Sequence, residues 1–260
     1  MPSSNPAFKD IDKALAAKSA PNAAYLQQMY DQPTYAGPQA PARTLTLDDV
    51  VAKTATVLAV AIIAGGLTAY FEAFTLMIPA LVVGLVLSLI IIFKRSTNPA
   101  LILSYAAAEG VLLGGITGWI ESIGPQYKGI ALQAIVGTLG VFVGMIFVYK
   151  TGVIRVTPKF TKILIGSMIG VLALMVFNMV ASWMFHFDTG LRSGGPIAII
   201  FSIVCIGIAA LSFLLDFDQI DKAMKVGVPA KYAWYFAFGL MVTLVWLYLE
   251  ILRLLSYMRN

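Results

Sequence analysis

Four acidic residues lie inside or directly after apolar stretches of this 260-residue chain, and they are the side chains best placed to do chemistry. A charged group in hydrocarbon costs at least about 2.5 kcal/mol on insertion scales, so such residues usually face a bundle interior or a water-filled cavity. Two carboxyls that meet there can share a proton. Carboxylates also bind hard cations such as Ca²⁺. The four residues are Glu109, Asp216, Asp218 and Glu250.

The surroundings of the first three acids favour different roles. Glu109 lies near the middle of its apolar stretch with no cation close to it in sequence. It suits a functional carboxyl, or alternatively a protonated one that is hydrogen-bonded to a neighbouring helix. Asp216, Asp218 and Asp221 close a later stretch. Asp218 and Asp221 suit a solvated helix end, whereas Asp216 lies nearest the hydrocarbon and is the better functional candidate.

The sequence allows two interpretations of Glu250. Arg253 follows it by three residues, so the two side chains can form an ion pair on one helix face. Alternatively, Glu250 meets a second carboxyl inside the bundle, and the pair then acts as a pH switch. Arg95 at the end of an apolar stretch and Asn178 within another are the polar companions that we add to these candidates.

Other chemistries lack their parts. The chain has one histidine, His186, and one cysteine, Cys205, which leaves zinc clusters and an intrachain disulfide without partners. Neither a phosphate-binding glycine loop nor the Gly-x-Gly-Asp loop of an intramembrane aspartyl protease occurs. We therefore expect neither an enzyme nor a cofactor. The formal charge of +5 is expected to set topology and not to bind nucleic acid.

Long apolar helices must position these residues. The chain is 59% hydrophobic and only 12% charged, whereas soluble domains are about 25% charged. Hydrocarbon about 30 Å thick requires about 20 apolar residues per helix. Seven stretches qualify, which predicts an all-α membrane protein with a seven-helix bundle. They are Val50 to Tyr70, Leu76 to Phe93, Pro99 to Ile120, Ile130 to Tyr149, Phe160 to Phe185, Pro196 to Phe217 and Tyr232 to Tyr257.

The residues before these stretches form a separate segment. Residues 1–45 are rich in Pro, Ala, Gln and Asn, a composition that cannot bury enough apolar surface to fold. We expect a disordered arm, with Tyr25, Tyr30 and Tyr35 as an alternative docking motif. The membrane domain then comprises residues 46–260. Thr46, followed by Asp48 and Asp49, predicts the start of the first helix.

The basic residues predict an orientation. Cytoplasmic connections usually carry the excess of Lys and Arg, so the N-terminus should be cytoplasmic and the C-terminus should lie on the opposite side. The richer face has Arg43, Lys53, Lys94, Arg95, Lys150, Arg155, Lys159, Lys162, Lys222, Lys225 and Lys231, and the other has Lys128, Arg192, Arg253 and Arg259.

Small residues one turn apart predict close helix packing, because little hydrophobic force acts between helices in lipid. The pairs are Gly114 with Gly118, Gly140 with Gly144, and Gly166 with Gly170.

The order of several short motifs resembles the Bax inhibitor family, and in particular its bacterial members with an extended N-terminal arm. The motifs are Ile78-Pro79 with Arg95, Glu109-Gly110, Phe177-Asn178, Leu215-Asp216 with Ile220, and Tyr248-Leu249-Glu250. The resemblance implies six helices around a central seventh in a bacterial inner membrane, and a pH-sensitive Ca²⁺ leak.

The resemblance also implies roles for three residues. Asp216 and Glu250 correspond to a carboxyl pair that protons and Ca²⁺ would occupy, and Arg95 corresponds to a latch on that pair. Asp216 and Glu250 are 34 positions apart. If the turn between their helices falls at Gly227-Val228-Pro229, the acids lie at different depths, and pairing then requires residues 232–238 to lie at the membrane interface.

Two functions remain open. The first is a cation leak channel, for Ca²⁺ in the first place, that is opened by protonation of Asp216 and Glu250. The alternative is a membrane regulator that does not transport ions and that binds a membrane protease or a stress-response partner through its arm or loops.

Overall fold

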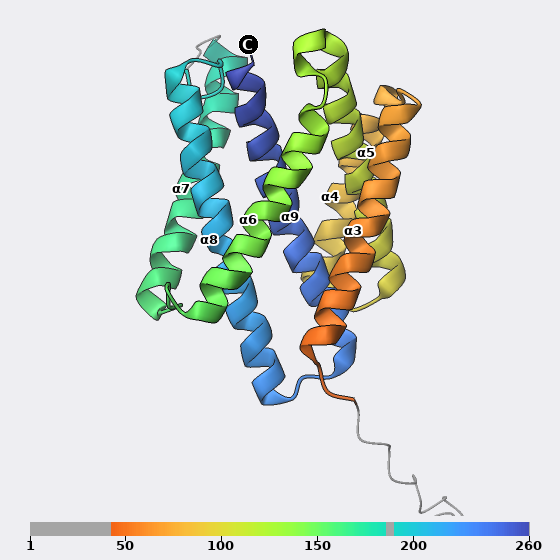
Figure 1. Cartoon of the computed structure of the whole chain (residues 1–260), viewed down its shortest axis with the longest axis vertical. Helices are drawn as coiled ribbons and strands as arrows, with labels where there is room; N and C mark the ends of the chain where they lie inside the picture. Colours follow the sequence, from red (N-terminus) through yellow and green to blue (C-terminus); the bar gives the residue numbers. More distant parts are fainter. Residues whose placement is uncertain (1–42, 186–189, 260) are drawn as a thin grey trace, which may run out of the picture. The chain divides into compact units, whose positions relative to one another are not determined.

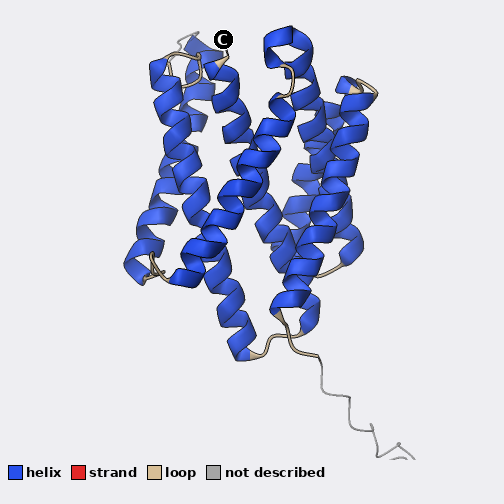
Figure 2. Ribbon diagram, in the orientation of Figure 1, coloured by secondary structure: helices blue, strands red, loops and turns tan. Residues whose placement is uncertain are grey.

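A computed structural model describes residues 43–185 and 190–259 of the chain, and long helices make up nearly all of this part (Figure 2). No strand occurs in these two ranges. Seven helices are long and apolar enough to cross a membrane. The predicted all-α fold with seven candidate spans is therefore confirmed. The helices are α3 (Leu47–Tyr70), α4 (Met77–Lys94), α5 (Pro99–Ile123), α6 (Ile130–Thr151), α7 (Pro158–Phe185), α8 (Pro196–Val226) and α9 (Ala233–Met258).

The first helix begins where the acids of its first turn predict. The Thr46 hydroxyl accepts a hydrogen bond from the backbone N–H of Asp49 at 3.2 Å. The Asp49 carboxylate in turn accepts one from the Thr46 backbone N–H, also at 3.2 Å. These reciprocal bonds form a capping box, which satisfies two backbone donors that the helix itself leaves open.

The helix α8 is longer than the apolar stretch predicts, because it continues past Phe217 to Val226. The added turns carry ion pairs of Asp218 with Lys222 and of Asp221 with Lys225, each at the spacing that joins neighbouring turns. The helix ends at Gly227, where φ is 76°. A residue without Cβ adopts this left-handed conformation without strain.

The helix α9 lies at the centre of the bundle. It packs against α3, α5, α6 and α8, and it has the largest buried share of the seven helices. Figure 1 shows α3, α4 and α5 on one side of it and α7 and α8 on the other. Most of the remaining contacts follow this division, because α3 and α4 pack on α5 while α6 and α7 pack on α8. A smaller contact joins α5 to α6.

Glycine packing is confirmed for one helix and is wrong for two others. A Cβ on Gly110 or Gly114 of α5 would overlap the backbone of α3 at Ala61 or Gly65, so these two helices are in backbone contact. In contrast, a Cβ on any of four outward-facing glycines would meet nothing within 4 Å, namely Gly140, Gly144, Gly166 and Gly170. The spacing alone does not distinguish a packed face from an open one.

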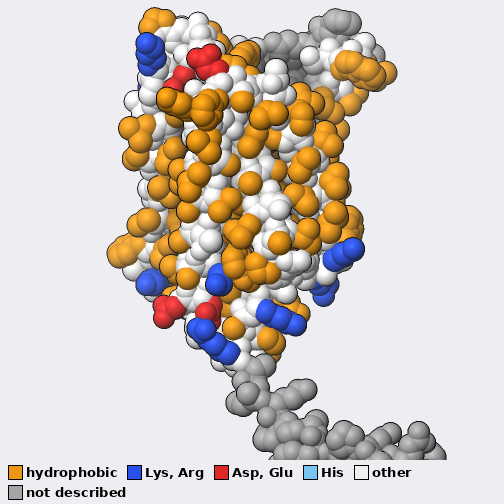
Figure 3. All heavy atoms as spheres, turned by 90° about the vertical axis from the view of Figure 1, so that its right-hand side faces the viewer, with side chains coloured by type: hydrophobic (Ala, Val, Ile, Leu, Met, Phe, Trp, Pro, Cys, Tyr) orange, Lys and Arg blue, Asp and Glu red, His pale blue; other side chains and the backbone are white. Residues whose placement is uncertain are grey.

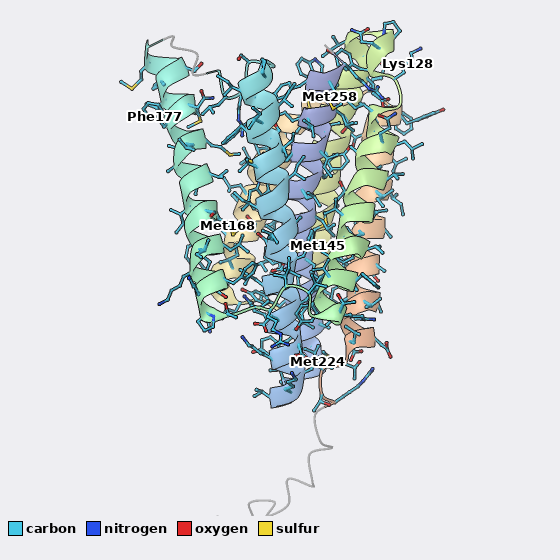
Figure 4. All side chains as sticks on the ribbon, turned by 60° about the vertical axis from the view of Figure 1, so that its left-hand side comes forward. Lys128, Met145, Met168, Phe177, Met224 and Met258 are labelled. Carbon is cyan, nitrogen blue, oxygen red and sulfur yellow. The ribbon has the colours of Figure 1, made fainter. Side chains whose placement is uncertain are left out.

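The connections between helices gather at two ends of the bundle. We call the end with the start of α3 the N-terminal end, and the end with the last turn of α9 the C-terminal end. Figure 4 shows Lys128 and Met258 at the C-terminal end and Met224 at the opposite one. Apolar side chains cover the flank between them in the space-filling view, while Lys and Arg lie toward the ends (Figure 3). This pattern fits a lipid-facing belt.

The residues just before α3 belong to the helical unit, which comprises Arg43–Asn260. Thr44 forms an antiparallel bridge with Pro229. The N–H of Leu45 donates to the carbonyl of Val228 at 2.8 Å, and the Leu45 side chain is buried. The chain is thus fastened to the α8–α9 connection before α3 begins. The expectation of a disordered arm concerns mainly residues 1–42, which lie outside the described residues.

Candidate functional site

Asp216 on α8 is held by α9 through a threonine. The hydroxyl of Thr243 donates a hydrogen bond of 2.8 Å to Oδ2 of Asp216. Both side chains are partly buried. The bond therefore joins two neighbouring helices at a polar point inside an apolar contact.

Glu250 on α9 is one of the most deeply buried polar residues of the described chain, at 1% exposure. Its Oε1 pairs with Nη1 of Arg253 at 2.7 Å. This is the local ion pair that the three-residue spacing allows. Its Oε2 is buried and has no hydrogen-bond partner. One oxygen of this carboxylate is therefore available to a proton, a water molecule or a cation.

The structure does not bring Asp216 and Glu250 into contact. Asp216 lies against Thr243, and Glu250 follows Thr243 by seven residues, which is two helical turns or about 10 Å along α9. The cause is the turn at Gly227, because it sets the register in which α9 returns along α8. The direct carboxyl pair that the family resemblance implies is thus absent here, and the expected difference in depth is present.

Apolar side chains close the interval between the two acids. Ala209 and Phe213 of α8 and Leu244 and Leu247 of α9 are all buried in one cluster. A cation could not pass through such packing without separation of the two helices. The arrangement is that of a closed contact with a carboxyl near each end.

Arg95 ends α4 in a left-handed conformation, with φ 46°. Its side chain is exposed. None of the ion pairs in residues 43–185 and 190–259 involves it. In this structure Arg95 therefore serves as a helix C-cap and does not latch onto either acid.

Glu109 on α5 lies at a separate polar point. It interacts with the hydroxyl of Tyr105, one turn earlier on the same helix. Tyr105 packs edge-on against Phe238 of α9, with ring centroids 4.9 Å apart. On its other side Glu109 faces α4, because a Cβ on Gly84 would lie 3.3 Å from Oε1 of Glu109. The glycine of α4 therefore makes room for the acid of α5.

The remaining candidates lie apart from these groups. Asp218 pairs with Lys222 on the extension of α8. Asn178 lines a hollow on α7 together with Ser182 and Arg192. His186 lies outside the described residues.

Residues that the sequence did not single out complete the surroundings of Glu250. Cys205 of α8 is fully buried and lies within electrostatic range of both Glu250 and Arg253. Burial, and then the nearby charge of Arg253, lower the pKa of the Arg192 guanidinium. Thr243 could have been identified as a polar residue two turns before Glu250. Cys205 and Arg192 carry no such local signal, because only the fold brings them to α9.

The donor set for a metal is small. No group of three His, Cys, Asp or Glu side chains gathers in the part of the chain that the structure describes. Glu250 offers one open oxygen, and Asp216 has one oxygen bonded to Thr243. Ca²⁺ takes six to eight oxygen ligands when it is bound firmly. On their own the two acids therefore supply fewer oxygen ligands than a firmly bound Ca²⁺ takes.

Seven apolar helices with polar points enclosed among them define a multi-pass helical membrane protein. Comparison with protein families matches residues 5–260 to the family described as Bax inhibitor 1 like. The chain belongs to this family, and the resemblance inferred from the short motifs is confirmed. A search of curated proteins found no match.

Proposed function

We propose that this protein is a pH-sensitive cation leak channel, for Ca²⁺ in the first place, with its pathway along the contact between α8 and α9. The observation that carries the proposal is the buried Glu250 carboxylate with one oxygen unsatisfied, on the central helix of the bundle. A buried polar atom without a partner is costly, so its retention favours a function. Membership of the Bax inhibitor 1-like family supports the same conclusion.

The two acids act as successive sites in this proposal. A helix rises 1.5 Å per residue, so Asp216 lies about 30 Å from the start of α8 at Pro196. Glu250 lies about 12 Å from the end of α9 at Met258. One acid thus stands near the N-terminal edge of the hydrocarbon and the other in the C-terminal half. A cation that enters at either end meets a carboxyl before it reaches the apolar closure.

Protonation controls opening through the bonds that each acid makes. A neutral Asp216 attracts the Thr243 hydroxyl less strongly, and a neutral Glu250 no longer pairs with Arg253. The first change weakens a bond between α8 and α9, and the second releases the Glu250 side chain from its partner on the same helix. The packing of Phe213 and Leu247 can then open.

The excess of basic residues at the N-terminal end supports a cytoplasmic N-terminus. We infer a bacterial inner membrane from the resemblance of the motifs to bacterial relatives. In this orientation Asp216 lies toward the cytoplasm, and its protonation reports cytoplasmic pH.

The test is Ca²⁺ flux into proteoliposomes from about pH 6 to about pH 8, with an indicator inside and K⁺ as a competing ion. Asp216→Asn and Glu250→Gln should each change the flux rate and flatten its pH response. The matched control is Asp221→Asn, on the same helix as Asp216 but paired at the surface with Lys225. The mechanism is wrong if both variants keep the rate and pH response of the native chain.

A regulator that binds a membrane protease or a stress-response partner is the second proposal. The observation that favours it is the bridge of Thr44 to Pro229, because an arm attached there could transmit binding directly to α8 and α9. Deletion of residues 1–42 leaves this bridge in place. A channel should keep its flux after the deletion, whereas a regulator should lose its partner.

A further inference from the structure

A second feature of the bundle is an apolar groove of about 250 Å³. The helices α3, α5, α6 and α9 line it, and all the glycines in the lining lie on α3 and α5. Gly66 shows that the space is open, because a Cβ there would meet nothing within 4 Å. Apolar cavities of about 150 Å³ already hold a benzene molecule. The groove is therefore large enough for a ligand.

The groove opens sideways, between α3 and α6. These two helices are not among the pairs that pack extensively within the described ranges, although both pack on α9 behind them. Ile62 of α3 and Leu139 of α6 both line the groove and are 54% and 41% exposed. Both helices are candidate membrane spans, so the phase outside this opening is hydrocarbon.

The groove has the length of one membrane leaflet. On α3 its lining runs from Leu58 to Ala69, which lie eleven positions apart, or about 16 Å along the helix. This is about half of a hydrocarbon core about 30 Å thick. Ala69 lies next to the end of α3, so the groove runs from the C-terminal edge of the bundle to about mid-membrane.

The end of the groove at the membrane edge is polar. Among the residues that line its deeper part, Thr138 alone has a polar side chain, and its hydroxyl donates to the carbonyl of Ala134. Tyr248 and Thr117 share a hydrogen bond of 2.8 Å at the polar end. Glu121 also lines it and accepts a bond from the N–H of Ala131 at 3.0 Å. Lys128 precedes Ala131 by three residues and is exposed at the same edge. An ammonium at that position is complementary to a phosphate group.

We propose that the groove binds one acyl chain of a membrane phospholipid, with its phosphate near Lys128 and its chain end near Leu58. With the acyl chain bound, the atoms that line the groove gain van der Waals contacts that an empty groove would not supply. The length of the groove, its lateral opening and its polar end all fit a lipid from the membrane leaflet at the C-terminal end of the bundle. The two acids of the proposed ion pathway do not line the groove, although Leu244 borders both features.

The test uses the full chain in proteoliposomes that contain a phospholipid with a photoreactive diazirine in one acyl chain. Peptide mass spectrometry then locates the adducts. A diazirine near the headgroup should label residues around Glu121 and Ala131, and one at the chain end should label residues around Leu58. Uniform labelling of all outward helix faces, or the reverse order of depth, would overturn the proposal.

A filled groove provides the matched comparison. Gly66→Leu places a side chain in the open space of the groove, whereas Gly144→Leu places one on the open outer face of α6. Gly66→Leu should reduce the amount of adduct in the groove to the amount found on the outer face of α7. Gly144→Leu should leave the groove adducts unchanged. Equal labelling in the two variants would contradict the proposal. If Gly66→Leu does not fold, the depth order in the native chain still decides.

A parallel reaction with a diazirine-bearing free fatty acid distinguishes the source of the chain. Phospholipid binding predicts that the phospholipid labels the groove at least as strongly as the fatty acid does, and that Lys128→Gln reduces the phospholipid adducts. Stronger labelling by the fatty acid than by the phospholipid, in the native chain, would overturn the assignment to a phospholipid.

Discussion

Thr243 of α9 donates its hydroxyl to Asp216 of α8 at 2.8 Å, and this bond takes the place of a carboxyl pair between the two helices. The acid on α9, Glu250, lies two turns further on with its own partner, Arg253. Two separate polar contacts therefore replace a single shared site. One joins α8 to α9, and the other lies within α9. Each can be broken alone.

Thr243→Val removes the donor to Asp216 while it keeps the shape of the side chain. A hydrogen bond to a charged group contributes about 1.5–3 kcal/mol, so we expect the variant to lose stability of about this size. In the flux assay the pH midpoint should rise, because the carboxylate loses a donor that favours its charged form. Thermal unfolding and Ca²⁺ flux measure the two effects.

Thr138→Val is the control for this change. Thr138 is also buried in a span, but its hydroxyl bonds only the carbonyl of Ala134 on its own helix. We expect a smaller loss of stability and no shift of the flux midpoint. Equal shifts of the flux midpoint in the two variants would show that the bond of Thr243 to Asp216 does not control the pH response.

Arg253→Met tests the buried ion pair. The substitution leaves the Glu250 carboxylate buried without its cation, which costs about 3–5 kcal/mol in comparable cases. The double variant with Glu250→Gln removes both charges and should recover most of that stability. A double-mutant cycle of thermal unfolding measures the coupling.

The surface pair of Asp221 with Lys225 provides the comparison, since the Asp221 side chain is 36% exposed and the Glu250 side chain only 2%. Its removal by Asp221→Asn should change the free energy of unfolding by only about 0–1 kcal/mol. If Arg253→Met costs no more than Asp221→Asn, then the Glu250 pair is not energetically buried.

The number and type of the helices could be predicted from the sequence, because long apolar runs have few alternatives once lipid is the solvent. The start of the first helix at Thr46 could also be predicted, because an N-cap and the acids of a first turn are local signals. The end of α8 was not predictable from hydropathy, since its last turns are polar and are held by ion pairs such as that of Asp218 with Lys222. Hydropathy marks the membrane part of a helix and not the whole helix.

The partners of the acids were predictable only in part. The pair of Glu250 with Arg253 depends on local spacing and was anticipated as one of two readings. The bond of Asp216 to Thr243 depends on the register of α8 against α9, which the turn at Gly227 sets. Register between helices is a property of packing, and no single-helix pattern encodes it.

Arg95→Gly separates the backbone role of Arg95 from its charge. A left-handed residue with a Cβ costs about 1–2 kcal/mol, and glycine relieves this cost. Since Arg95 makes no ion pair in the described residues, the variant should be at least as stable as the native chain. Its flux and pH midpoint should be unchanged, and so should those of Arg95→Lys. A shift of the pH midpoint in Arg95→Gly that is absent in Arg95→Lys would support the predicted contact of Arg95 with the acids.

The close approach of α3 and α5 predicts that an alanine at Gly114 destabilises the protein. A Cβ on Gly114 would overlap the backbone carbonyl of Gly65, and backbone cannot rotate away as a side chain can. Gly114→Ala should therefore lose about 1–3 kcal/mol, the usual cost of overpacking.

Gly140→Ala adds the same methyl group to α6, where it meets nothing within 4 Å. It should be neutral or gain up to about 1 kcal/mol, because alanine favours the helix more than glycine does. Thermal unfolding of the two variants in the same lipid measures the difference. In lipid, close backbone packing has no hydrophobic substitute. A loss of stability on Gly140→Ala as large as that on Gly114→Ala would therefore mean that α6 has a packing partner on its outer face.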